Sequence, residues 1–202
     1  TEFLPVSSSA HLVILPKFLD WPDQGLAFDV VLHFATLCAI VYYYRLTLVE
    51  MSKDFACSIV TRKMQGQSML AWAVLLGTIP VGLTGFFLKD SIELNLRSYE
   101  VVAFATIFFG FLLGFSDWIH RFLGRSREFI RSSDILIVGL FQALALIPGT
   151  SRSGITITAA LLIGLSRSLS IKFAFLLSIP VIALATLLKT FDLVNEVNQV
   201  DW

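Results

Sequence analysis

Two short segments of this 202-residue chain each combine a proline, a serine cluster and an ionisable side chain. The first reads TEFLPVSSSAH and begins at Thr1, and the second reads PGTSRSGIT and begins at Pro148. A proline ends a helix because it lacks the N–H, and the next helix begins with free N–H donors and the positive end of its dipole. Such a helix start binds anions, phosphate groups among them. Both segments therefore predict polar sites at helix starts.

The second segment has the residue types of a phosphate-binding site. Arg152 carries a planar guanidinium that can hold two phosphate oxygens at once. Ser151 and Ser153 supply hydroxyl groups, and Gly149 lets the backbone come close to a ligand. Thr156 lies four residues after Arg152, one turn along a similar helix face.

The first segment has the residue types of a hydrolytic site. Glu2 can bind a divalent cation or act as a base, and Ser8 is a candidate nucleophile. His11 follows Ser8 by three residues, within reach on a helix. Together the two segments hold an acid, a nucleophile and an anion binder, the set required for phosphoryl-group hydrolysis.

Each of these groups also has a structural interpretation. Serines within membrane helices often bond the preceding turn or join two helices. Arg152 could pair with Glu2 for structural reasons alone, and an isolated His11 would be an ordinary interior histidine. The functional hypothesis rests on the coincidence of all these groups in two similar segments.

The composition indicates a membrane protein. Hydrophobic residues make up 56% of the chain, charged residues only 15%, and the mean hydropathy is +0.79. Apolar runs predict four spanning helices, at about 28–44, 69–88, 100–116 and 172–188, with an atypical segment over 135–166. Cys38 and Cys57 have no metal-binding spacing and predict no disulfide. A net charge of zero argues against a nucleic-acid partner.

The charges outside the apolar runs divide cleanly between two sets of loops. Loops 45–68, 117–134 and 165–172 hold ten basic and five acidic residues, whereas 16–29, 89–100 and 189–202 hold four basic and nine acidic ones. The positive-inside rule places the first set in the cytoplasm. Only Glu2 and Arg152 fall outside both sets, and an ionisable residue at membrane depth indicates function.

The two segments predict an inverted repeat in an all-α, polytopic membrane protein. Segment 135–166 leaves and rejoins the cytoplasmic side, so we expect a re-entrant helix hairpin; residues 1–20 would form a second hairpin that enters from outside. The two hairpins would meet near the membrane midplane. Repeat 1 would cover about 1–118 and repeat 2 about 134–202, within a single domain of residues 1–202. Fewer spans follow the second hairpin than the first, so we expect a chain truncated at both ends.

These segments resemble the two signature motifs of the undecaprenyl-diphosphate phosphatase family, the BacA type associated with bacitracin resistance. The resemblance extends to LLGTIPVGLTG and FLLSIPV, and so to nearly the whole chain. It implies an enzyme of the bacterial inner membrane that removes the terminal phosphate of undecaprenyl diphosphate. The product is the carrier lipid reused in peptidoglycan synthesis.

The resemblance also implies roles for individual residues. Glu2, Ser8 and His11 match the catalytic residues of the family, and Glu2 matches part of its binding site for a divalent cation, Mg²⁺ or Ca²⁺. Four residues match the phosphate-binding motif: Ser151, Arg152, Ser153 and Thr156. The active site would open to the outer side, with the polyprenyl tail of the lipid diphosphate in the bilayer. Ser8 and an activated water both remain possible nucleophiles, and a homodimer stays open.

Two other functional classes were considered. In type 2 phosphatidic-acid phosphatases five residues separate an SR pair from a histidine. At the corresponding positions this chain has Thr158 and Phe173. A polyprenyl-phosphate transporter or flippase is the stronger alternative, because inverted repeats with broken helices are typical of transporters.

Overall fold

The computed structural model describes residues 2–8, 11–12, 19, 25–96, 98–124 and 126–199. These residues form helices joined by turns, and the described part of the chain contains no β-strand beyond one isolated bridge between Arg127 and Leu165. The all-α prediction is confirmed. The elements are α2 (Gly25–Tyr43), α3 (Arg45–Thr61), α4 (Ser68–Asn95), α5 (Tyr99–Leu123), α6 (Ser132–Ala143), the 3₁₀ helix η1 (Leu144–Leu146), α7 (Arg152–Leu162) and α8 (Arg167–Gln199).

Three helices are long and apolar enough to cross a membrane, namely α4, α5 and α8. Helices α2 and α3 meet the same criterion only as a pair, and the chain bends by 75° between them. The protein is therefore a multi-pass membrane protein with three such helices, or four spans if the bent pair counts as one. Three predicted spans fall within α4, α5 and α8, and the first, 28–44, overlaps α2, which meets the criterion only together with α3.

The prediction of a loop over residues 45–68 was wrong in its secondary structure. Residues 45–61 form α3, which ends where Arg62 adopts a left-handed conformation with φ of 55°. The charged residues of this segment suggested a loop, but helix formation requires only that the polar side chains have access to solvent. Asp54 then fixes the following turn by accepting a hydrogen bond of 2.7 Å from the Gln67 N–H.

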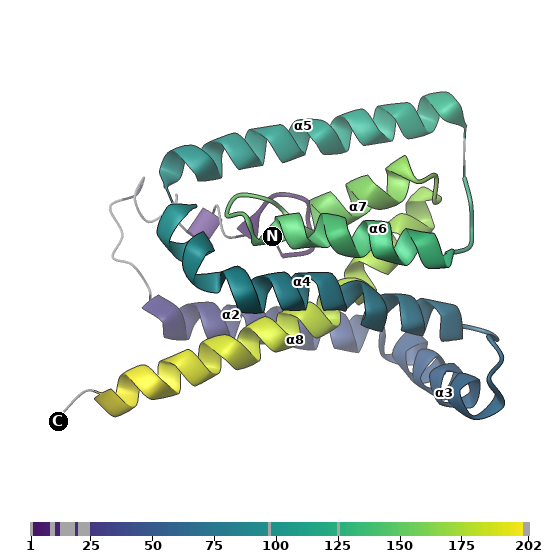
Figure 1. The fold of residues 1–202 in the computed structure, drawn as a ribbon, viewed down its shortest axis with the longest axis horizontal. Coiled ribbons are helices and arrows are strands. Elements are labelled where there is room, and N and C mark those ends of the chain that lie inside the picture. Colours follow the sequence, from purple (N-terminus) through teal and green to yellow (C-terminus); the bar gives the residue numbers. More distant parts are fainter. Residues whose placement is uncertain are drawn as a thin grey trace.

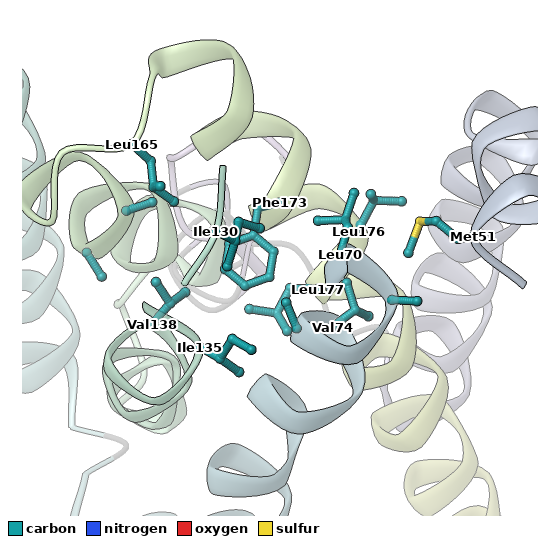
Figure 2. Close-up of a cluster of buried hydrophobic side chains, with 14 residues drawn as sticks. Met51, Leu70, Val74, Ile130, Ile135, Val138, Leu165, Phe173, Leu176 and Leu177 are labelled. Atoms are coloured by element: carbon teal, nitrogen blue, oxygen red, sulfur yellow. The ribbon is translucent and has the colours of Figure 1, made fainter. Parts of the chain in front are cut away.

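Helices α4 and α6 pack closely because glycines face each other at their crossing. A Cβ added at Gly139 would lie 3.0 Å from the Gly77 carbonyl oxygen, so a larger residue would push the helices apart. The side-chain amide of the fully buried Gln142 also donates to that carbonyl, at 3.2 Å. The main hydrophobic core surrounds this crossing and draws on α3, α4, α6, α7 and α8, with Phe173 near its centre (Figure 2).

Helices α6 and α7 are short. At 1.5 Å per residue their 12 and 11 residues extend about 18 Å and 16 Å, less than the ~30 Å of a bilayer core. Arg127 joins the start of one to the end of the other: its guanidinium donates to both carboxylate oxygens of Asp134, at 2.9 and 3.2 Å, and to the Ile163 carbonyl at 2.7 Å. The two helices therefore form a pair that is tied together at its open end.

Helix α5 lies lengthwise along this pair and contacts α7, while α4, α2 and α8 pack on the other side (Figure 1). The site described below lies where the tip of the α6–α7 pair meets residues 2–8. The predicted first hairpin, over residues 1–20, falls largely outside the described residues.

Candidate active site

The second serine segment forms a break between two helices, as predicted. Ile147 is extended (ψ 119°), the conformation favoured before a proline, and Thr150 N–H closes a turn on its carbonyl at 3.0 Å. Ser151 is the N-cap of α7, and its hydroxyl accepts the Gly154 N–H at 3.2 Å. The predicted helix start is therefore confirmed, and Arg152 is its first residue.

The tip of the break is fixed against α5. Gly149 has a φ of 94°, and a Cβ at this position would lie 2.3 Å from the Val102 carbonyl oxygen. Only glycine satisfies both the backbone angle and the close approach. The Thr106 hydroxyl adds a hydrogen bond to the Gly149 carbonyl at 3.1 Å. Helix α5 thus sets the position of the N-terminus of α7.

Glu2 connects the two serine segments. One of its carboxylate oxygens accepts a hydrogen bond from Arg152 Nη2, and the other accepts one from the Ser8 hydroxyl. The Glu2 and Arg152 side chains are only 8% and 17% exposed. The fold therefore brings Glu2, Ser8 and Arg152 together, although Glu2 and Arg152 are 150 residues apart in sequence. Such pairing offsets much of the cost of burying two charges.

Arg152 retains unused hydrogen-bonding capacity. Its Nη1 is buried and has no hydrogen-bond partner among the described residues. A guanidinium carries five N–H donors, and a buried donor without a partner is costly. Nη1 therefore carries N–H donors that no described residue uses, while Nη2 is bound to Glu2.

The orientation of His11 can be assigned from its hydrogen bond. Its Nδ1 lies 2.8 Å from the Ser7 carbonyl oxygen, which can only accept, so Nδ1 carries the proton. In the neutral ring Nε2 is then an acceptor and able to take a proton. The His11 side chain is exposed and lines the same cavity as Ser151.

This cavity, the head cavity, has a volume of about 290 Å³. Its lining comes from both serine segments and from α5, and includes Ser7, His11, Thr106, Gly149, Ser151 and Gly154. Pro5 also lines it, and a Cβ added at Gly154 would lie 3.5 Å from that of Pro5. The two serine segments therefore meet around this space, and Glu2, Ser8 and Arg152 lie beside it rather than in its lining.

The other two predicted phosphate ligands are placed differently. The Ser153 hydroxyl lies 3.2 Å from that of Ser151, next to the helix start. Thr156 is 1% exposed, and its hydroxyl donates to the carbonyls of Arg152 and Ser153 at 2.9 and 3.1 Å. The Thr156 hydroxyl is thus engaged within α7, and its predicted contact with phosphate remains a prediction.

His33 is not among the residues that the sequence predicted for the site. This residue of α2 lies close enough to Glu2 to contribute to the electrostatic environment of that carboxylate. Its position in the middle of an apolar run was the available signal, because ionisable residues at membrane depth are functional candidates by default.

Comparison with known proteins gives one consistent family. The chain is 52% identical to an undecaprenyl-diphosphatase of Vesicomyosocius okutanii subsp. Calyptogena okutanii and 54% identical to one of Nitrosococcus oceani. A third, from Campylobacter concisus, is 50% identical. Each alignment covers 100% of this chain and 76% of the relative. The model of the family described as bacitracin resistance protein BacA matches residues 1–202, and the chain therefore belongs to the BacA family.

Proposed function

We propose that this protein hydrolyses undecaprenyl diphosphate to undecaprenyl phosphate and inorganic phosphate, which recycles the carrier lipid for peptidoglycan synthesis and confers bacitracin resistance. The observation that carries the proposal is the contact of Glu2 with both Ser8 and Arg152 at the N-terminus of α7. This cluster lies in a membrane protein whose relatives, about half identical, are named undecaprenyl-diphosphatase. Those names favour hydrolysis over lipid transport as the function of the site.

In the proposed reaction the terminal phosphate lies at the start of α7. Arg152 Nη1, which has no partner among the described residues, and the free N–H groups of α7 bind its oxygens. These donors stabilise the charge that develops as the anhydride P–O bond breaks and undecaprenyl phosphate leaves. Because the donors are already in place, little reorganisation is needed.

The attacking group is Ser8 or a water molecule. The Ser8 hydroxyl donates its proton to Glu2, an arrangement suited to a nucleophile activated by a base. If Ser8 attacks, a phosphoserine forms and water then hydrolyses it. His11 Nε2 is available to take a proton from the attacking water, and Nδ1–H holds the ring on the Ser7 carbonyl.

A divalent cation, Mg²⁺ or Ca²⁺, is part of the proposal, with Glu2 as its protein ligand. The described residues contain no group of three or more His, Cys, Asp or Glu side chains that could hold a metal. Both oxygens of Glu2 are already hydrogen-bonded, so the described residues alone do not fit a complete cation site. The proposal is supported by the coordination that Mg²⁺ usually has in proteins, which is one or two carboxylates plus substrate phosphates.

We also propose that α6 and α7 form a re-entrant hairpin, and that residues 1–20 form its inverted counterpart. Both helices are too short to span a bilayer. Arg127 ties the start of α6 to the end of α7, at the open end of the pair. The contacts between Glu2 and Arg152 and between Pro5 and Gly154 agree with two hairpin tips that meet. Broken helices of this kind occur where they line a cavity walled by protein.

The proposed membrane is the bacterial inner membrane, with the site open to its outer side. Arg121 and Arg127 mark the cytoplasmic side by the positive-inside rule. Thr106, which lines the head cavity, lies 15 residues before Arg121 on α5, about 22 Å along the helix. This distance supports a site in the outer half of the bilayer.

Phosphate release from undecaprenyl diphosphate by the purified full-length protein tests the proposal, with and without a chelator. Arg152→Lys keeps the charge but loses the planar fork, and we expect its kcat to fall by about 100-fold or more. Arg121→Lys, on the exposed end of α5, is the matched control and should stay near wild type. We expect the chelator to stop release. A folded wild-type protein that releases no phosphate would refute the proposal.

A further inference from the structure

A second, larger cavity adjoins the head cavity and has a volume of about 580 Å³. We call it the α5 groove, because α5 forms one wall while α7, α8 and residues 3–5 form the rest. Pro5, Gly110 and Leu113 line both cavities, so the two lie next to each other along α5. The side chains that line the α5 groove alone are mostly apolar: Phe3, Leu4, Ile157, Leu161, Ile171 and Phe175.

Charged side chains line the far end of the α5 groove. Asp117 and Arg167 line it there, and the Arg167 guanidinium donates to Asp117 Oδ1 at 2.7 Å. Arg121 pairs with the other oxygen of Asp117 at 2.9 Å. The groove therefore runs from the serines of the head cavity, through an apolar stretch, to the basic end of α5.

Glycines on α5 create the space. A Cβ added at Gly110 or at Gly114 would meet no atom within 4 Å among the described residues, and both glycines are exposed. They lie four residues apart, so one follows the other by one turn on the same helix face. Larger side chains at these two positions would project into the groove.

We infer that the α5 groove binds the first part of the isoprenoid tail, next to the diphosphate. This inference rests on the proposed function, because it takes the head cavity as the phosphate site. A diphosphate held there is covalently joined to an apolar chain, which must leave the head cavity through an apolar passage. The α5 groove shares three lining residues with that cavity and has the matching chemistry. The first isoprene units thus contact protein, and only the rest of the tail lies in lipid.

Burial in the groove adds binding energy that a free phosphate cannot gain. The tail leaves lipid rather than water, so the gain comes from close packing of the isoprene units against the side chains of the groove. Molecules with a short tail use only the beginning of the groove. The structure therefore assigns to the groove a preference for longer isoprenoid diphosphates, separate from the chemistry of the head cavity.

Gly114→Leu in the full-length protein tests this assignment, because Gly114 lines the α5 groove but not the head cavity. Gly82→Leu is the matched control, since a Cβ at Gly82 of α4 also meets nothing within 4 Å and Gly82 lines neither cavity. Both changes raise helix propensity equally. The substrates are geranyl diphosphate, with a short tail, and undecaprenyl diphosphate.

We expect Gly114→Leu to lower kcat/KM for undecaprenyl diphosphate by about tenfold or more, mainly through KM, and to change it less than about twofold for geranyl diphosphate. Gly82→Leu should change neither value. Equal losses for both substrates, with a lower Tm, would mean that a segment of the protein fills the groove. No change at all would mean that an ordinary bilayer lipid occupies it. Either result overturns the inference.

A binding experiment separates failure of this inference from failure of the proposed function. An undecaprenyl diphosphate analogue with a photoreactive diazirine in its first isoprene units is irradiated with the wild-type protein, and the labelled peptides are identified by mass spectrometry. We expect labels within residues 110–117 and 157–175, and their loss in Gly114→Leu. These labels require binding but no turnover, so they test the groove even if no phosphate is released. Labels found only elsewhere would overturn the inference.

Discussion

Glu2 and Arg152 form a buried ion pair across 150 residues of sequence, and the same carboxylate accepts a hydrogen bond from the Ser8 hydroxyl. This single carboxylate thereby joins the candidate nucleophile to the candidate phosphate ligand. This ion pair is compatible with a purely structural role of the two charges and also with a catalytic role. The two interpretations differ in what happens when both charges are removed.

A double-mutant cycle on Glu2 and Arg152 distinguishes them. Glu2→Gln leaves the largely buried guanidinium without its counter-charge, and we expect a loss of about 3 kcal/mol of stability together with a large loss of turnover. In Glu2→Gln/Arg152→Gln no charge is left unpaired, so the Tm should recover while phosphate release stays absent. Recovery of both stability and release in the double variant would show that the pair is structural only.

Ser8→Ala removes the hydroxyl that donates to Glu2. We expect kcat to fall by about 100-fold or more, because the nucleophile is lost. Ser116→Ala is the matched control: this buried serine of α5 donates to the Leu113 carbonyl at 2.7 Å, and its loss should leave kcat unchanged. Wild-type protein quenched in acid during turnover should carry labelled phosphate on Ser8. Turnover without any phosphoserine would identify water as the nucleophile.

His11→Asn separates the two nitrogens of this ring. The asparagine amide can still donate to the Ser7 carbonyl in place of Nδ1, but nothing replaces Nε2. We expect a fold like that of wild type with kcat lower by about 100-fold or more. His120→Gln is the control, since His120 bonds through Nε2 to the Leu165 carbonyl at the opposite end of α7. Full activity of His11→Asn would exclude His11 as the proton acceptor.

Asp134→Asn tests the tie between α6 and α7. The Asp134 side chain is 4% exposed and accepts from Arg127 and from the Arg131 N–H, so its neutralisation leaves a charge largely unpaired. We expect a loss of about 3 kcal/mol of stability, seen as a lower Tm in detergent, with kcat per folded molecule unchanged. Asp117→Asn, a 30% exposed partner in a surface pair, should cost about 1 kcal/mol or less. Equal Tm values for both variants would contradict this assignment.

Gly149→Ala tests how the tip of the α6–α7 pair is held. The φ of 94° and the contact with Val102 both exclude a Cβ, so the alanine variant must move the start of α7 away from α5. We expect lower stability and almost no phosphate release. Gly82→Ala, in open space within α4, should be neutral or slightly stabilising. A Gly149→Ala variant with normal turnover would show that α5 does not position the site.

Much of this arrangement could be predicted from the sequence because the signals were local. Apolar runs located α4, α5 and α8, and the order of proline and serine around Pro148 located the break and the helix start that follows it. The meeting of Glu2 and Arg152 was expected only as one alternative among several. Its basis was that both were ionisable residues outside the loops.

Other features depended on contacts that no local pattern reveals. No local pattern predicted the bend between α2 and α3, and the charged residues of 45–61 looked like a loop although they form a helix. The closeness of His33 to Glu2 depends on how α2 lies against the site. The space beside Gly110 and Gly114 is likewise a property of three helices together, so the glycines alone do not reveal it.

The separation of Glu2 from Arg152 in sequence also has a consequence for biosynthesis. A ribosome that adds about 5–20 residues per second makes Glu2 roughly 8–30 s before Arg152. During that interval the carboxylate has no guanidinium partner, and an unpaired charge is costly within the bilayer. We therefore expect residues 2–8 to stay at the membrane surface until the second half of the chain has been inserted.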